Sequence, residues 1–238
     1  MSKNPFTIIF GIEPDSMIPR NAEYNQVISD FTSSSPVSYA YVITGVRGCG
    51  KTVLMTSIQN HFSKQGDWIT LRLNPDLDLY ESSISQLSEH ISIKSEIITE
   101  ASVSFAGIGG GVARRSLSDN ETLLKKMLIE AKKKKKRVLI TIDEVSNTAN
   151  IKTFFHSYQS FIGERLPVFL LITALPENFS ALSNAKNSTF IRRLPKIRLH
   201  GLSDVLVEDK YMEIFSLNQD EALVLTKLIK GYPYAFQL

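Results

Sequence analysis

A glycine-rich segment with one lysine and one threonine contains the residues best suited to phosphate chemistry. Residues 45–52 fill the pattern G-x-x-x-x-G-K-[ST], a loop whose backbone N–H groups form a nest for oxyanions. Lys51 would add a mobile positive charge for the terminal phosphates without packing against the protein, and the Thr52 hydroxyl could ligate Mg²⁺. The alternative is a glycine-rich turn that matches by chance. The candidate nucleotide-binding residues here are Gly45, Val46, Arg47, Gly48, Cys49, Gly50, Lys51, Thr52 and Val53.

Two adjacent carboxylates follow an apolar run further along the chain. Asp143 and Glu144 come directly after residues 138–142, the pattern usually called Walker B. An aspartate at the carboxyl end of a buried strand can hold Mg²⁺ and its hydration shell, and the longer Glu144 side chain can orient a water for attack on the γ-phosphate. A helix cap or a surface turn is the alternative for such a pair taken alone. Because the pair lies downstream of a phosphate loop, we interpret it as part of a site that hydrolyses ATP.

Three more residues are candidates for contact with the γ-phosphate. Thr173 ends another apolar run, and its hydroxyl would face the γ-phosphate or the attacking water, with a cap on the following turn as the alternative. Arg192 and Arg193 could reach the γ-phosphate of a neighbouring subunit as an arginine finger. A solvated basic pair is an equally weighted alternative.

A parallel sheet would position these residues. Apolar or alternating runs predict strands at 39–44, 67–73, 137–142, 167–172 and 195–199. Helical spacing predicts a helix after the phosphate loop and others over 77–94, from Ser118 to the lysines at 132–136, over 151–162 and over 218–230. The pattern at 97–108 is typical of an extended segment. The glycines at 105–111 indicate a flexible turn, and the alternative is a loop that contacts substrate with the help of Arg114 and Arg115. Alternation of helices with fully apolar strands implies an α/β fold with both faces of the sheet covered.

Length and composition set the domain organisation and exclude several classes of protein. The 238 residues, 43% of them hydrophobic, can bury a full core, and we expect a core domain over 1–200 and a small helical lid over 201–238. Because the sequence ends in an apolar run, we expect the natural protein to continue and the lid to be truncated here. One cysteine and four scattered histidines exclude a disulfide framework and a Cys/His metal cluster.

Charge and hydropathy bear on partners and location. The sequence has no apolar run long enough to span a bilayer and no signal-peptide core at its start, so we expect a cytoplasmic protein. The net charge of +3 permits an anionic partner without identifying one. The lysines at 132–136 could bind DNA phosphate or an acidic lipid surface, but we favour the alternative that cations at the end of a helix complement its dipole.

The combined motifs resemble P-loop ATPases of the AAA+/STAND type, close to archaeal-type ATPases related to replication initiators. The phosphate loop, the Asp143-Glu144 strand end and Thr173 carry the resemblance, together with two segments expected beside adenine. Residues 17–23 are similar to the hhGRxxE segment of STAND proteins, with Ile18 and Arg20 matching and a proline in place of the glycine. Residues 231–233 resemble the GxP motif, whose proline, here Pro233, approaches the base from the lid.

This resemblance implies a P-loop core that binds ATP or ADP with Mg²⁺, hydrolyses ATP and couples the nucleotide state to conformational change or assembly. The lid would sense adenine, since no sensor-2 arginine follows Gly231. A signalling switch with negligible turnover is the alternative. A small-molecule kinase is disfavoured, because a kinase needs an acceptor site and a lid inserted in the core. DNA, a protein or a second copy of the chain stay open as partners.

Overall fold

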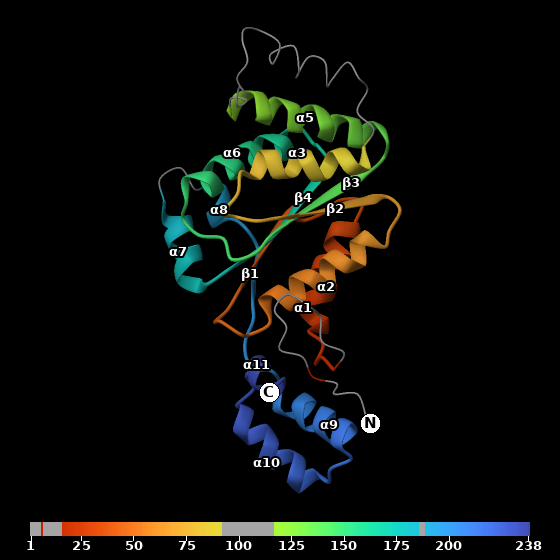
Figure 1. Ribbon diagram of the computed structural model, residues 1–238, viewed down its shortest axis with the longest axis vertical. Coiled ribbons are helices and arrows are strands. Elements are labelled where there is room, and N and C mark those ends of the chain that lie inside the picture. Colours follow the sequence, from red (N-terminus) through yellow and green to blue (C-terminus); the bar gives the residue numbers. More distant parts are fainter. Residues whose placement is uncertain (1–5, 7–15, 92–116, 186–188) are drawn as a thin grey trace, which may run out of the picture.

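The computed structural model describes residue 6 and residues 16–91, 117–185 and 189–238. In these ranges five parallel strands form one sheet in the order β2-β3-β4-β1-β5 (Figure 1). The predicted extended segment at 97–108 and the glycine-rich segment with Arg114 and Arg115 lie outside the described residues. The strands are β1 (Ala40–Thr44), β2 (Trp68–Leu73), β3 (Arg137–Ile142), β4 (Val168–Ala174) and β5 (Lys196–Arg198).

Helices alternate with these strands, as the apolar patterns predict. The helices before β5 are α1 (Asn21–Thr32), α2 (Lys51–Ser63), α3 (Leu79–His90), α5 (Leu117–Lys133), α6 (Ala149–Gly163), α7 (Pro176–Asn184) and α8 (Thr189–Arg192). Those after it are α9 (Asp204–Phe215), α10 (Gln219–Ile229) and α11 (Pro233–Phe236). α5 begins one residue before the predicted cap at Ser118, and β4 extends two residues past its predicted end, to Ala174. The helices α1, α7 and α8 were not predicted from the sequence.

Helices cover both faces of the sheet, as predicted. Successive strand residues point to opposite faces, so Val138 and Ile140 pack on one side with α3, α5 and α6, and Leu139 packs on the other with α1 and α2. All five residues of β1 and all seven of β4 are buried. This is the pattern expected of central strands in a parallel α/β sheet.

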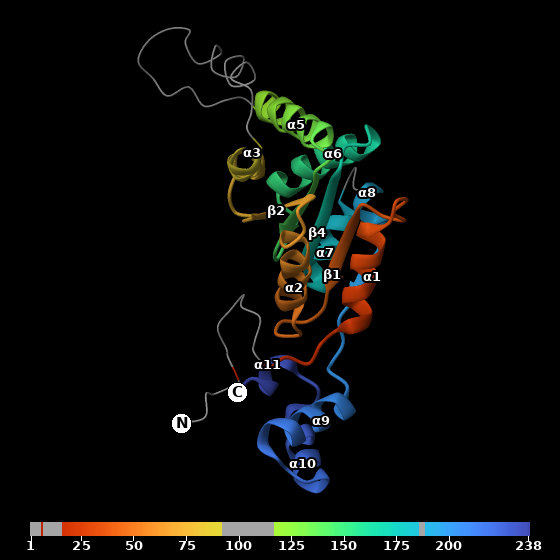
Figure 2. The same cartoon turned by 90° about the vertical axis from the view of Figure 1, so that its right-hand side faces the viewer.

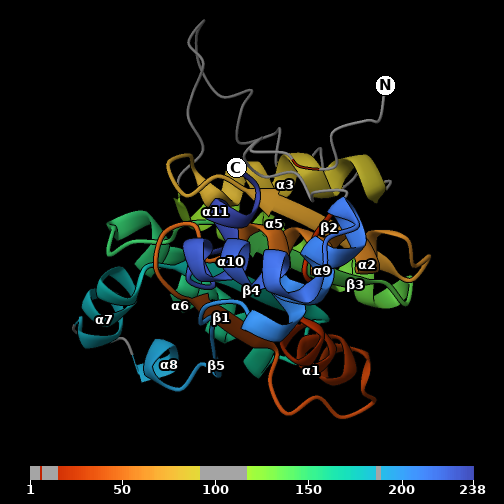
Figure 3. The same ribbon diagram turned by 90° about the horizontal axis from the view of Figure 1, so that it is seen from below.

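The helices after β5, which we call the lid, form a separate small cluster. Val207, Tyr211, Ala222, Ile229 and Phe236 pack together there with Ile18, which precedes α1. The side-chain N–H of Gln237 also donates to the carbonyl of Ser16, at 2.7 Å. Figures 1 and 2 place the lid beyond one end of the sheet, with α5 near the opposite end, and Figure 3 views the molecule from the lid side.

The lid therefore contacts the segment that precedes α1, and the Gly231 carbonyl beside α10 accepts from the Leu202 N–H in the segment after β5. The domain boundary near residue 200 stays a prediction. In the described part of the chain, none of the helices combines the length and the apolar character that crossing a bilayer requires.

Candidate functional site

The glycine-rich loop lies where β1 leads into α2, as its sequence context predicts. Gly48 and Gly50 have φ values of 71° and 91°, a left-handed conformation that side chains with a Cβ rarely adopt. Gly50 is the N-cap of α2 and supplies no side-chain cap. The first N–H groups of α2 therefore face the loop without an intrahelical partner, which suits the binding of an anion.

Lys51 is buried inside this loop. Its ammonium donates hydrogen bonds to the carbonyl oxygens of Gly45 and Val46, both at 2.9 Å. The expectation that Lys51 packs against nothing is therefore wrong, because its side chain ties the first half of the loop to the start of α2. The same side chain holds a positive charge at the loop, where phosphate oxygens would need it.

Asp143 joins three segments of the chain that are far apart in sequence. One carboxylate oxygen accepts from the Thr52 hydroxyl at 2.8 Å, and the other accepts from the Thr173 hydroxyl. The strand order explains this meeting, since β4 lies between β3 and β1 and pairs Thr173 with Ile43. The hydroxyl and the carboxylate are hard oxygen donors of the kind that Mg²⁺ prefers, so Thr52 and Asp143 fit the predicted metal site.

Thr173 also holds the backbone of Glu144. Its hydroxyl accepts from the Glu144 N–H at 2.8 Å, and its carbonyl accepts from the Val145 N–H at 2.8 Å. Glu144 has a φ of 52°, which is uncommon for a residue with a side chain and is held here by these bonds. Thr173 thus positions both carboxylate residues, and contact with a γ-phosphate stays a prediction.

A cavity of about 770 Å³ opens beside the loop, within the size range of small-molecule sites. Residues 47–53 of the loop line it, and so does Glu144. Ile18 and Arg20 from the segment before α1 and Pro233 from the lid also line it. Both segments expected beside adenine therefore reach the same cavity as the phosphate loop. Gly45, Val46, Asp143 and Thr173 are not among the residues that line it.

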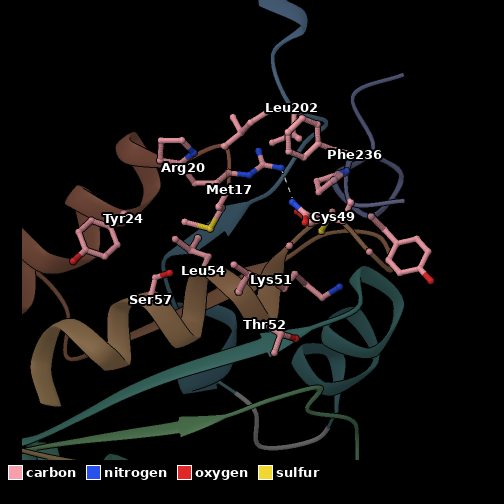
Figure 4. Close-up of a pocket in the computed structure, with 18 of the residues that line it drawn as sticks. Met17, Arg20, Tyr24, Cys49, Lys51, Thr52, Leu54, Ser57, Leu202 and Phe236 are labelled. Atoms are coloured by element: carbon pink, nitrogen blue, oxygen red, sulfur yellow. Dashed lines mark hydrogen bonds between the residues drawn. The ribbon is translucent and has the colours of Figure 1, made fainter. Parts of the chain in front are cut away.

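Arg20 links the loop to the beginning of the lid. Its guanidinium donates to the Cys49 carbonyl at 3.2 Å and to the His200 carbonyl at 2.5 Å. Figure 4 shows Arg20 extending toward Cys49, with the bond drawn as a dashed line. In this structure the Arg20 side chain acts by holding protein segments together around the cavity.

Several residues that line the cavity were missed from the sequence. They come from α1, from α2, from the segment after β5 and from the lid, and include Tyr24, Ser57, Leu202 and Phe236 (Figure 4). His61 of α2 also lines the cavity. The Tyr24 hydroxyl lies 2.9 Å from His61 Nδ1, and Gln65 Nε2 lies 2.7 Å from His61 Nε2. The polar face of α2, with Ser57, His61 and Lys64 at helical spacing, is the signal that could have indicated this wall.

Arg192 and Arg193 do not reach this cavity. Both are exposed, and Arg192 Nε donates to the Ser183 carbonyl at 2.7 Å. Pairing of Val42 with Lys196 places the two arginines at the amino end of β5, whereas the phosphate loop follows the carboxyl end of β1. Their predicted role therefore requires the site of another subunit.

Three lysines of the run at 132–136 have acceptors within the chain. Lys132 donates to the Arg165 carbonyl at 2.9 Å, Lys133 to Glu130 at 2.6 Å, and Lys136 to the Gly66 carbonyl. These contacts are those of a solvated helix end and need no external partner.

Structural comparison identifies the fold. Cdc6p from Pyrobaculum aerophilum matches with a TM-score of 0.61 and 14% identity over 99% of this chain and 63% of that one. The ORC1 protein of Aeropyrum pernix, solved in complex with DNA, gives a TM-score of 0.56 and 14% identity over 93% of this chain and 58% of that one. Domain III of the replication initiation protein DnaA from Thermotoga maritima gives a TM-score of 0.53 and 14% identity over 93% of this chain and 82% of that one.

The chain therefore shares the fold of Cdc6p, ORC1 and DnaA domain III, an α/β fold built on a five-stranded parallel sheet. It spans less than two thirds of the length of Cdc6p and of ORC1. No family model matches the sequence, and no curated protein matches it.

Proposed function

We propose that this chain is an ATPase module that binds ATP and ADP with Mg²⁺, hydrolyses ATP and converts the nucleotide state into a change of lid position or assembly. One observation carries the proposal. The phosphate loop, Glu144 and both adenine-side segments line a single cavity, and Asp143 is hydrogen-bonded to the loop beside it. Residues from four separate parts of the chain thus lie around one cavity, which supports the proposal.

In this proposal each group has a separate task. The N–H groups of the loop and Lys51 bind the β- and γ-phosphates, and adenine lies between Ile18 and Pro233. Thr52 and Asp143 would hold Mg²⁺, which neutralises phosphate charge when bound. Glu144 orients the attacking water and polarises it for attack. Thr173 holds the Asp143 side chain and the Glu144 backbone in position through the hydrogen bonds described above.

The partner is a separate part of the proposal. The matched ORC1 structure contains DNA, and its likeness to this chain extends to the fold alone. We propose DNA or a second copy of this chain as partners and the cytoplasm as the location. The lysine run does not support DNA specifically, because three of its members have acceptors inside the protein.

A signalling switch of the STAND type, with tight binding and negligible turnover, is the second candidate. Pro233 lines the cavity from the lid, and Arg20 ties the loop to the His200 carbonyl at the start of the lid. A lid held directly against a bound nucleotide would slow exchange of that nucleotide, as a switch requires.

Calorimetric titration with ATP, ADP and duplex DNA, together with phosphate release and mass-resolved oligomer measurements, tests the proposal. We expect ATP and ADP to bind with Mg²⁺, and ATP to be hydrolysed with release of inorganic phosphate. Tight binding with no phosphate release would favour the switch. Absence of binding to either nucleotide in the folded protein would exclude both.

Arg192→Ala and Arg193→Ala test assembly in solution. A finger that acts across subunits lowers turnover only where subunits meet, so we expect about a tenfold or greater loss at concentrations that support oligomers. Mixing either variant with a Glu144→Gln subunit should restore part of the turnover, because each subunit then supplies what the other lacks. A wild-type specific rate that does not change with protein concentration would contradict this role.

A further inference from the structure

Tyr232 connects the lid to the phosphate loop directly. Its hydroxyl donates to the carbonyl oxygen of Arg47 at 2.8 Å, across a sequence separation of 185 residues. The ring lies against Gly48, since a Cβ built on Gly48 would lie 2.2 Å from the Tyr232 hydroxyl oxygen and 2.6 Å from Cζ. Gly48 thus serves two purposes, because it permits a φ of 71° and leaves room for the tyrosine.

The backbone of the lid presents Tyr232 in a fixed position. The Leu202 N–H donates to the Gly231 carbonyl at 2.7 Å, and the Tyr232 N–H donates to the Ile229 carbonyl at 2.8 Å. Gly231 has a φ of 68°, and a Cβ there would lie 2.8 Å from the Leu202 carbonyl oxygen. These backbone bonds connect the tyrosine to the segment after β5 and to the end of α10, so a movement of α10 moves its hydroxyl.

The bond to Arg47 determines how the next N–H group points. A trans peptide is planar, and its C=O and N–H point in opposite directions. The peptide between Arg47 and Gly48 is trans, since the described residues contain no cis peptide bond. With its carbonyl held by Tyr232, this peptide directs the Gly48 N–H away from the tyrosine. Accepting a hydrogen bond at the carbonyl also polarises the peptide and strengthens its N–H as a donor.

We propose that Tyr232 is a positioning residue that sets the Gly48 N–H for a phosphate oxygen and so couples lid position to phosphate binding. This inference rests on the proposed function, in which the loop binds phosphates. A lid that moves away releases the Arg47 carbonyl and weakens the loop as an anion site. By thermodynamic linkage, a phosphate ligand that favours the held loop stabilises the docked lid by the same factor.

Tyr232→Phe tests the proposal, because it removes the hydroxyl and keeps the ring against Gly48. We expect the Kd for ADP and for inorganic tripolyphosphate to rise about fivefold, the usual effect of one lost hydrogen bond. Without ligand, amide hydrogen exchange should become faster in the loop, at 46–49, and in the lid, at 203–230. The thermal midpoint should stay close to that of the wild type, because the residue is 38% exposed and its ring is retained.

Tyr41→Phe is the matched control. Its hydroxyl donates to Asp30 at 2.9 Å, away from the cavity, so the variant removes a tyrosine hydroxyl bond elsewhere in the protein and should leave both Kd values unchanged. A tyrosine with a purely structural role would lower the thermal midpoint and leave the affinity of the folded protein intact.

Unchanged tripolyphosphate affinity together with unchanged lid exchange in Tyr232→Phe would overturn the proposal. If the wild type bound neither ligand, the proposed function would fail by itself. Exchange at 46–49 would then decide whether Tyr232 holds the loop: faster exchange in Tyr232→Phe supports the contact, and equal exchange refutes it.

Discussion

Lys51→Ala should weaken ATP and ADP binding about a hundredfold or more. The ammonium would form charge-assisted hydrogen bonds to phosphate oxygens, each worth roughly 1.5–3 kcal/mol, and every 1.4 kcal/mol is about a tenfold change in Kd. The alanine also leaves the carbonyls of Gly45 and Val46 without the donor they have in the structure. The variant therefore loses both the loop conformation and the positive charge that would bind the phosphates. This makes it one of the two largest effects we expect. Isothermal titration measures it.

Two further variants make the result specific. Lys51→Met keeps the apolar stem of the side chain and removes the charge, so it should lose nearly as much affinity as alanine. Lys133→Ala removes a surface lysine that pairs with Glu130 and should bind ATP as the wild type does. Wild-type affinity in a folded Lys51→Met protein would show that the loop is not a phosphate site.

Glu144→Gln should retain ATP affinity within about twofold and reduce turnover by about a hundredfold or more. The amide keeps the shape of the side chain and loses the charge that polarises water, and a general base typically contributes a factor of about 10² to 10⁴. The backbone of residue 144 should stay in place, because its N–H bond to Thr173 does not involve the changed group. Steady-state phosphate release and ATP titration measure the two quantities separately.

Asp143→Asn and Glu164→Gln complete this test. Asp143→Asn should reduce both turnover and the Mg²⁺ dependence of ATP binding, since Asp143 would hold the metal and accepts the Thr52 hydroxyl bond. Glu164→Gln changes a surface carboxylate paired with Lys125 and should leave turnover unchanged. Wild-type turnover in both Asp143→Asn and Glu144→Gln would contradict the hydrolytic assignment and leave binding without hydrolysis as the better account.

The fold class was predictable because its signals are local. Strands buried on both faces read as continuous apolar runs, and β3 and β4 are of this kind. The phosphate loop was also predictable, since its residue types and spacing occur in one continuous segment. α1 was not predicted, because Val27 and Phe31 are its only buried residues and give too weak a helical pattern.

Properties that depend on pairing between distant segments were not predictable from the sequence. The position of β4 between β3 and β1 brings Thr173 to Asp143, and no local pattern contains this order. Tyr232 carries no signal of its own beside Gly231 and Pro233, because the contact that matters is with a loop 185 residues earlier. The same holds for Lys51, whose bonds to the loop carbonyls depend on how the loop folds.

The order of the strands also constrains how the protein can fold. β1 pairs with β4 and β5, with Ala40 opposite Leu170 and Val42 opposite Lys196. The sheet around β1 can therefore form only after both of these later strands have been made. During synthesis β1 emerges long before these partners, as an unpaired and mostly apolar strand open to aggregation. Contacts at such separation make folding slow, because the entropy of closing a long loop is lost before pairing compensates for it. The phosphate loop, which follows β1, is thus synthesised early but reaches its final structure only after β4 and β5 have paired with β1.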